Sequence, residues 1–276
     1  MNSPFAMQLN LPVRLVLPVD FHFNLPFLLG RLNGRPCRLL LDSGAPSITL
    51  NALHLPEERL RESGELMGAS GAIKSFLISV DELRFEDWTM GPMEVRAIND
   101  EQLEAKLGFR YDGLIGFRQL IHYDWMVDYQ RGELHLWATF PKADYPVQEE
   151  VRIRYMNHLP VIEVEIAGEK YQLLIDTGSG GMLFDQEKAE RIAAVVELGE
   201  DDELRGAGGR KLTVSGGQLK EFTLKGIRIA DSSISFADIS PLVQRLGPFD
   251  GIIGYSLLSQ VRTVVSWENR HLYLLE

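Results

Sequence analysis

The chain is poor in cysteine, in basic residues and in long apolar runs. Its 276 residues include one cysteine, Cys37, which excludes an intramolecular disulfide and is compatible with a reducing compartment. Lys and Arg number 28 against 39 Asp and Glu, and the net charge of −11 argues against nucleic acid or an anionic membrane as the main partner. No apolar run approaches the roughly 20 residues that span a bilayer, and the first residues do not read as a signal peptide. We therefore expect a cytoplasmic protein without a membrane segment.

The sequence also lacks the spacings of several common catalytic sites. Its six histidines show no H-x-x-x-H or similar pattern, so we expect no metal site and no cofactor. The stretch SGAPS (43–47) does not match the G-x-S-x-G of a nucleophile elbow. The four tryptophans are interpreted as packing residues rather than as a platform for nucleic-acid bases.

An internal repeat runs through almost the whole chain. The segment LPFLLGRLNGRPCRLLLDSG (25–44) aligns with LPVIEVEIAGEKYQLLIDTG (159–178), and Asp42 aligns with Asp176 at an offset of 134 residues. Three later pairs align at an offset of 138: GASG (68–71) with GAGG (206–209), YDGLIGF (111–117) with FDGIIGY (249–255), and VDYQRGELHL (127–136) with VSWENRHLYL (265–274). Two copies of this length indicate a duplicated domain rather than a solenoid.

The repeat predicts the domain organisation. Residues 1–140 form a first lobe that carries the DSG motif, and 151–276 form a second lobe that carries the DTG motif. Residues 141–150, which lie in a stretch with two prolines and a charge cluster, are predicted to link the lobes.

Most of the chain has the pattern of β-strands. The apolar runs before Asp42 and Asp176 are typical of strands buried on both faces. Asp185 is predicted to cap a helix whose apolar positions are Ala189, Ile192, Ala193 and Val196. A shorter helix is expected over residues 53–63, and helical turns near Gln119 and Leu257.

The two Asp-Ser/Thr-Gly motifs are the candidate catalytic elements. Each stands at the end of a buried strand, where an ionised carboxylate is costly unless it is compensated. The glycine lets the backbone N–H approach the carboxylate, and the hydroxyl of Ser43 or Thr177 can hydrogen-bond into the opposite half. Two copies related by a twofold axis would bring Asp42 and Asp176 face to face.

These residues resemble those of the aspartic peptidases. LLLDSGAPS, LLIDTGSGG, DGLIGF and DGIIGY are similar to the motifs of both the pepsin-like and the retroviral-type enzymes, and the closing stretch DYQRGELHL is most similar to the bacterial retropepsin-like subgroup. The resemblance covers nearly all of the chain from about residue 24. It implies a mainly β, bilobal acid-protease fold with two similar retropepsin-like β-barrel lobes related by a pseudo-twofold axis.

The resemblance also assigns roles. Asp42 and Asp176 would be the catalytic pair, sharing one proton as aspartic-peptidase dyads do, with no metal and no covalent intermediate. Support of the active-site loops is assigned to Ser43, Gly44, Thr177, Gly178 and Ser179. Flap residues that close on substrate are predicted at Gly68, Ala69, Ser70 and Gly71 and at Gly206, Ala207, Gly208 and Gly209. These turns contain no aromatic residue, unlike the flap of pepsin-like enzymes.

Two further expectations concern carboxylates. Ala45 follows the first motif and Ser179 the second, and a hydroxyl there can bond to its own aspartate. Asp176 is therefore predicted to be the more acidic member of the pair. Asp112 and Asp250 are also paired by the repeat, but each precedes a glycine, and a turn or capping role is favoured over catalysis.

Three functions fit these observations. The first is an aspartic endopeptidase acting on an extended peptide or protein, for which one chain suffices because its two halves complete one site. The second is a catalytically inactive peptide-binding module of the same fold. The third is a processing enzyme that cuts a single partner protein.

Overall fold

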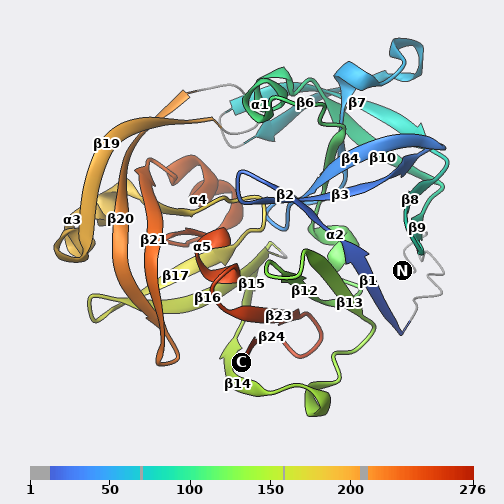
Figure 1. Cartoon of the computed structure of the whole chain (residues 1–276). Helices are drawn as coiled ribbons and strands as arrows, with labels where there is room; N and C mark the ends of the chain where they lie inside the picture. Colours follow the sequence, from blue (N-terminus) through green and yellow to red (C-terminus); the bar gives the residue numbers. More distant parts are fainter. Residues whose placement is uncertain (1–12, 69–70, 158, 206–210) are drawn as a thin grey trace, which may run out of the picture.

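The computed structural model describes residues 13–68, 71–157, 159–205 and 211–276, with the backbone alone at 66–68, 71–72, 198–205 and 211–215. The fold is mainly β and bilobal, as predicted, with two similar lobes on a shared sheet (Figure 1). In the described residues, no helix has the length and apolar character needed to cross a membrane.

The shared sheet has six strands, three from each half of the chain. Its order is β1-β13-β12-β23-β24-β14. The strands are β1 (Arg14–Pro18), β12 (Asp124–Asp128), β13 (Glu133–Trp137), β14 (Val147–Arg152), β23 (Arg262–Ser266) and β24 (His271–Leu275). The two halves meet where β12 pairs antiparallel with β23. Outward from that junction, β12, β13 and β1 of the first half correspond to β23, β24 and β14 of the second.

The first lobe contains the ten-stranded sheet, which lies at the upper right of Figure 1. Its strands are β2 (Asp20–His22), β3 (Leu25–Leu32), β4 (Arg35–Leu41), β5 (Thr49–Asn51), β6 (Arg61–Gly68), β7 (Gly71–Val80), β8 (Leu83–Phe85), β9 (Trp88–Met90), β10 (Met93–Ile98) and β11 (Gly113–Ile115). The second lobe contains an eight-stranded sheet that closes on itself through a β16–β20 pairing. Its strands are β15 (Arg154–Met156), β16 (Leu159–Ile166), β17 (Glu169–Ile175), β18 (Met182–Asp185), β19 (Val196–Arg205), β20 (Lys211–Leu224), β21 (Ile227–Ala237) and β22 (Gly251–Ile253).

The helices are few and short. They are α1 (Glu101–Leu107), α2 (Phe117–Leu120), α3 (Ala189–Ile192), α4 (Ser240–Leu246) and α5 (Tyr255–Leu258), with 3₁₀ turns η1 (Ala52–His54), η2 (Glu57–Arg59), η3 (Lys142–Asp144), η4 (Gln186–Lys188) and η5 (Ala193–Val195). The turns expected near Gln119 and Leu257 are confirmed as α2 and α5.

The helix predicted after Asp185 is confirmed in part. The Asp185 side chain accepts a hydrogen bond from Glu187 N and α3 follows, but Val196 already belongs to strand β19. The helix expected over residues 53–63 is wrong. That segment forms η1, η2 and the start of β6, because pairing with β7 takes residues 61–63 into the sheet.

The predicted linker is not a free connection. Strand β14 begins at Val147 and pairs with β24, so residues 147–150 of the proposed linker 141–150 are part of the shared sheet. The sheet mixes strands from both halves, and the division into lobes at 1–140 and 151–276 therefore stays a proposal.

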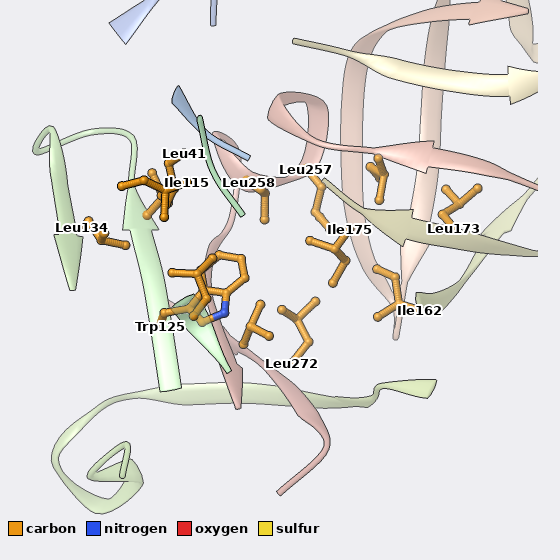
Figure 2. Close-up of a cluster of buried hydrophobic side chains, with 14 of the residues drawn as sticks. Leu41, Ile115, Trp125, Leu134, Ile162, Leu173, Ile175, Leu257, Leu258 and Leu272 are labelled. Carbon is orange, nitrogen blue, oxygen red and sulfur yellow. The ribbon is translucent and has the colours of Figure 1, made fainter. Parts of the chain in front are cut away.

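One apolar core runs from lobe to lobe through the shared sheet. Figure 2 shows Leu41 and Ile115 of the first lobe, Ile175 and Leu257 of the second, and Trp125 and Leu272 of the shared sheet between them. All six are buried. Because this core is continuous, the two aspartate-bearing strand ends are set on one packed base.

Candidate active site

Asp42 and Asp176 occupy equivalent places at the ends of buried strands. Strand β4 ends at Leu41 and lies parallel to β11, and strand β17 ends at Ile175 and lies parallel to β22. The next backbone N–H continues each ladder: Asp42 N donates to Ile115 O at 2.9 Å, and Asp176 N donates to Ile253 O at 2.9 Å. Each aspartate is thus fixed by its own half.

The glycine of each Ile-Gly element packs directly behind the aspartate loop. A Cβ at Gly116 would lie 2.4 Å from Ser47 N, and one at Gly254 would lie 2.4 Å from Asp176 O. The residues that follow these glycines bind the same loops, since Phe117 N donates to Ala45 O at 2.8 Å and Tyr255 N donates to Ser179 O at 3.0 Å. These close contacts explain why both copies of the repeat carry glycine there.

Crossed hydrogen bonds join the two loops. Ser43 N donates to Thr177 Oγ1 at 2.9 Å, and Thr177 N donates to Ser43 Oγ at 3.0 Å. Each hydroxyl then donates to a strand of the opposite half, Thr177 Oγ1 to Leu41 O at 2.6 Å and Ser43 Oγ to Ile175 O at 3.2 Å. Both side chains have 0% exposure, so these bonds are made away from water and hold the loops in register.

The two carboxylates share one backbone donor. Gly44 N lies 3.0 Å from Asp42 Oδ1 and 3.1 Å from Asp176 Oδ1. Asp42 Oδ1 also accepts from Ala45 N, and Asp176 Oδ1 accepts from Gly178 N at 2.8 Å. A Cβ at Gly44 would lie 2.4 Å from Asp176 Oδ2, and one at Gly178 would lie 2.7 Å from Asp42 Cγ. Only glycine leaves room for the opposite carboxylate at these positions.

The surroundings make the pair electrostatically unequal. Burial and the nearby negative charge of Asp176 raise the pKa of Asp42 well above its ordinary value. Burial also raises the pKa of Asp176, but hydrogen bonds from Gly178, Asp42 and Gly44 oppose that rise. The two carboxyls therefore hold one proton between them, and the pKa is raised more strongly for Asp42 than for Asp176.

The structure corrects the reason given for this inequality. Ser179 was expected to bond to Asp176, but its hydroxyl donates to Gly181 O at 3.0 Å. Each aspartate accepts from two backbone N–H groups, so the difference lies in the carboxyl–carboxyl contact, which lowers the pKa of Asp176 and raises that of Asp42. Ser179 contributes its backbone to the site, because its N–H donates to Asp176 O at 3.1 Å.

Asp112 and Asp250 lie away from the pair and connect strands. Asp112 accepts from Arg38 N at 2.9 Å and returns its own N–H to Arg38 O. Asp250 makes the same two bonds with Gln172 and lies 3.3 Å from Lys188 Nζ. These contacts are those of a structural clamp, in agreement with the turn or capping role favoured from sequence.

The backbone forms a β-hairpin in each of the two expected flap regions. Strands β6 and β7 pair up to Gly68 and Gly71, and β19 and β20 pair up to Arg205 and Lys211. The tips of both hairpins, Ala69 and Ser70 in the first and Gly206, Ala207, Gly208 and Gly209 in the second, lie outside the described residues. Figure 1 shows both hairpins extending toward the top of the molecule, opposite the shared sheet.

Two tyrosines near the pair, Tyr111 and Tyr129, were not predicted from the sequence. Tyr111 is buried, and burial together with the charges of Asp100 and Asp42 raises its pKa well above the ordinary value. Tyr129 is likewise in the field of Asp176, which together with burial raises its pKa. Both tyrosines lie inside the repeated motifs YDGLIGF and VDYQRGELHL, so the repeat itself carried the available signal.

The described residues contain no group of three or more His, Cys, Asp or Glu side chains arranged to hold a metal ion. The donors that the site does offer are backbone N–H groups directed at carboxylates. In comparisons with known proteins, a family model described as aspartyl protease matches the chain twice, at residues 29–118 and 162–257. No curated protein sequence gives a significant match.

Proposed function

The chain belongs to the aspartyl protease family, and on that basis we propose that it is an active aspartic endopeptidase with Asp42 and Asp176 as its catalytic pair. The observation that carries the proposal is the single Gly44 N–H within hydrogen-bond distance of both carboxylates. Two carboxylates this close cannot both ionise easily, so they hold one proton between them.

In the proposed reaction, Asp176 is the general base. Its carboxylate takes a proton from a water molecule as the water attacks the peptide carbonyl carbon. Asp42, which holds the shared proton, donates a hydrogen bond to the carbonyl oxygen and stabilises the charge that develops there. As the tetrahedral intermediate collapses, the proton that Asp176 took from the water passes to the nitrogen of the leaving amine. Asp42 keeps its own proton, and the pair returns to its starting state.

The substrate we propose is an extended peptide or an unfolded protein segment. Both hairpins are antiparallel β-structures, and extended peptides are commonly held by backbone hydrogen bonds to such elements. The glycine-rich tips at 68–71 and 206–209 are proposed to close over it. One chain provides both aspartates, so a monomer is sufficient for one site, and the single cysteine keeps the cytoplasm as the proposed compartment.

The test compares the wild type with Asp176→Asn and Asp42→Asn on a diverse peptide mixture from pH 3 to 8, with cleavage read by mass spectrometry. Asp87→Asn is the matched control, because Asp87 is an exposed carboxylate outside the site. Cleavage by the wild type and the control that is lost in both site variants supports the proposal. An absence of cleavage in all four proteins favours the inactive peptide-binding module, and cleavage that survives in both site variants excludes the proposed pair.

A further inference from the structure

Three aromatic rings meet at the junction of the two halves near Asp176. Phe21 and Tyr129 come from the first half, and Tyr255 comes from the second. The Phe21 and Tyr129 rings are stacked at 4.9 Å, and Tyr129 meets Tyr255 edge-on at 5.4 Å. We call these three residues the first triad. Ring pairs in this range stabilise a contact beyond the apolar area they bury.

The repeat generates a second triad with the halves exchanged. Tyr155 and Trp267 come from the second half and Phe117 from the first. Tyr155 and Trp267 have ring centroids 3.9 Å apart, and Phe117 and Trp267 have centroids 4.9 Å apart. Tyr129 and Trp267 are equivalent in the repeat, since each is the first residue after the corresponding strand, β12 or β23.

Each central ring touches the residue that supports the aspartate loop of the other half. Tyr129 contacts Tyr255, whose N–H donates to Ser179 O beside Asp176. Trp267 contacts Phe117, whose N–H donates to Ala45 O beside Asp42. A chain of contacts therefore runs from the shared sheet of one half to the aspartate loop of the other.

Polar contacts fix the same two turns across the junction. Trp267 N donates to Asp124 Oδ1 of the first half at 3.2 Å. Next to Tyr129, Asp128 is buried and lies 3.3 Å from Arg262 Nε of the second half. Because Tyr129 and Trp267 are each held from both halves, movement of one half relative to the other must move these rings.

We propose that Tyr129 and Trp267 are positioning residues, and that each sets the aspartate loop of the opposite half through its ring contact with Tyr255 or Phe117. The two triads thereby fix the distance between Asp42 and Asp176 through contacts with the shared sheet. The crossed hydroxyl bonds fix the same distance through contacts between the two aspartate loops. This inference rests on the proposed pair of catalytic aspartates.

The test uses Tyr129→Leu and Trp267→Leu, which remove the ring contacts, with Tyr129→Phe and Trp267→Phe as conservative variants that keep a ring. Tyr145→Leu is the matched control, because Tyr145 is also a half-buried aromatic residue but packs on Trp137 and Phe140 under the shared sheet. Site-specific titrations of Asp42 and Asp176 by carboxyl-carbon NMR are recorded for every variant, together with kcat and KM on a peptide that the wild type cleaves.

The Leu variants are expected to narrow the difference between the two aspartate pKa values and to lower kcat about 10- to 100-fold at unchanged KM, since displacements near 1 Å have effects of this size. The Phe variants and Tyr145→Leu are expected to keep the wild-type difference and kcat. If Tyr129→Leu does not fold, Tyr129→Met fills similar space without a ring and is expected to give the same result.

The inference is overturned if the Leu variants lose stability as Tyr145→Leu does but keep both the pKa difference and kcat. It is also overturned if Tyr129→Phe behaves like Tyr129→Leu, because the hydroxyl and not the ring contact would then act. The titrations require no turnover. If the wild type cleaves no peptide, the proposed function fails while the positioning of the two aspartates is still tested by NMR.

Discussion

Replacing Thr177 with valine tests the crossed hydrogen bonds that join the two halves. The substitution keeps the shape of the side chain but removes a hydroxyl that accepts from Ser43 N at 2.9 Å and donates to Leu41 O at 2.6 Å. Thr177 has 0% exposure, so water cannot replace these bonds without rearrangement. One buried N–H and one buried C=O lose their partner.

The expected loss of stability follows from those two groups. An unsatisfied buried donor or acceptor costs about 1–3 kcal/mol, so Thr177→Val is expected to lower the free energy of unfolding by about 2–6 kcal/mol. Thr177→Ser keeps the hydroxyl and loses one methyl group, which costs about 1 kcal/mol. A folded protein is stable by only about 5–15 kcal/mol, so the difference between these two variants is large enough to measure.

Urea unfolding followed by tryptophan fluorescence gives the free energy of each variant. Ser43→Ala is the counterpart on the other side, because it removes the bonds to Thr177 N and Ile175 O, and it is expected to cost a similar amount. If Thr177→Val and Thr177→Ser agree within about 0.5 kcal/mol, the usual spread of such measurements, the crossed bonds do not hold the halves together.

Three further predictions concern the carboxylates. Gly44→Ala places a Cβ 2.4 Å from Asp176 Oδ2, so kcat/KM on a peptide substrate is expected to fall about 100-fold or more, and unchanged kinetics would contradict the close approach. Because the pKa of Asp42 is raised on folding, the free energy of unfolding should fall as pH rises above about 4. Asp42→Asn should make this dependence on pH weaker. If urea unfolding shows the same dependence on pH in the variant and the wild type, the pKa of Asp42 is not raised. Burial raises the pKa of Asp100 from 3.8 to about 6, so Asp100→Asn should be more stable than the wild type by about 3 kcal/mol above pH 6 and equal to it at pH 3, as thermal or urea unfolding at both pH values will show.

The kinetic pH profile should reflect the same pair of groups. We expect a bell-shaped kcat/KM, because the active form holds one proton between Asp42 and Asp176. Protonation of Asp176 removes the base on the acid side, and loss of the proton from Asp42 removes the donor on the alkaline side.

Part of the molecule could be predicted from the sequence because the signals are local and appear twice. The apolar runs that end in Asp42 and Asp176 have the pattern of strands buried on both faces, and they form strands β4 and β17. The mainly β fold with two similar lobes followed from these copies. Hydrogen bonds from the hydroxyls of Ser43 and Thr177 into the backbone of the opposite half were also expected, and both are present.

Predictions that relied on helical spacing in a single segment were less successful. A helix was expected over residues 53–63, yet only the short turns η1 and η2 are helical, and residues 61–63 belong to β6, where pairing with β7 overrides the local preference. Val196 fails as a helical residue for the same reason, because it pairs with Leu219 in β20.

The sequence by itself determined the strands, the repeat and the two aspartates, because hydrophobic pattern and motif are properties of contiguous residues. Only the tertiary structure decided that both carboxylates lie within hydrogen-bond distance of the Gly44 N–H, and that β1 and β14 complete a sheet shared by both halves. Both contacts join groups that are far apart in the chain, so the pattern of contiguous residues does not specify them.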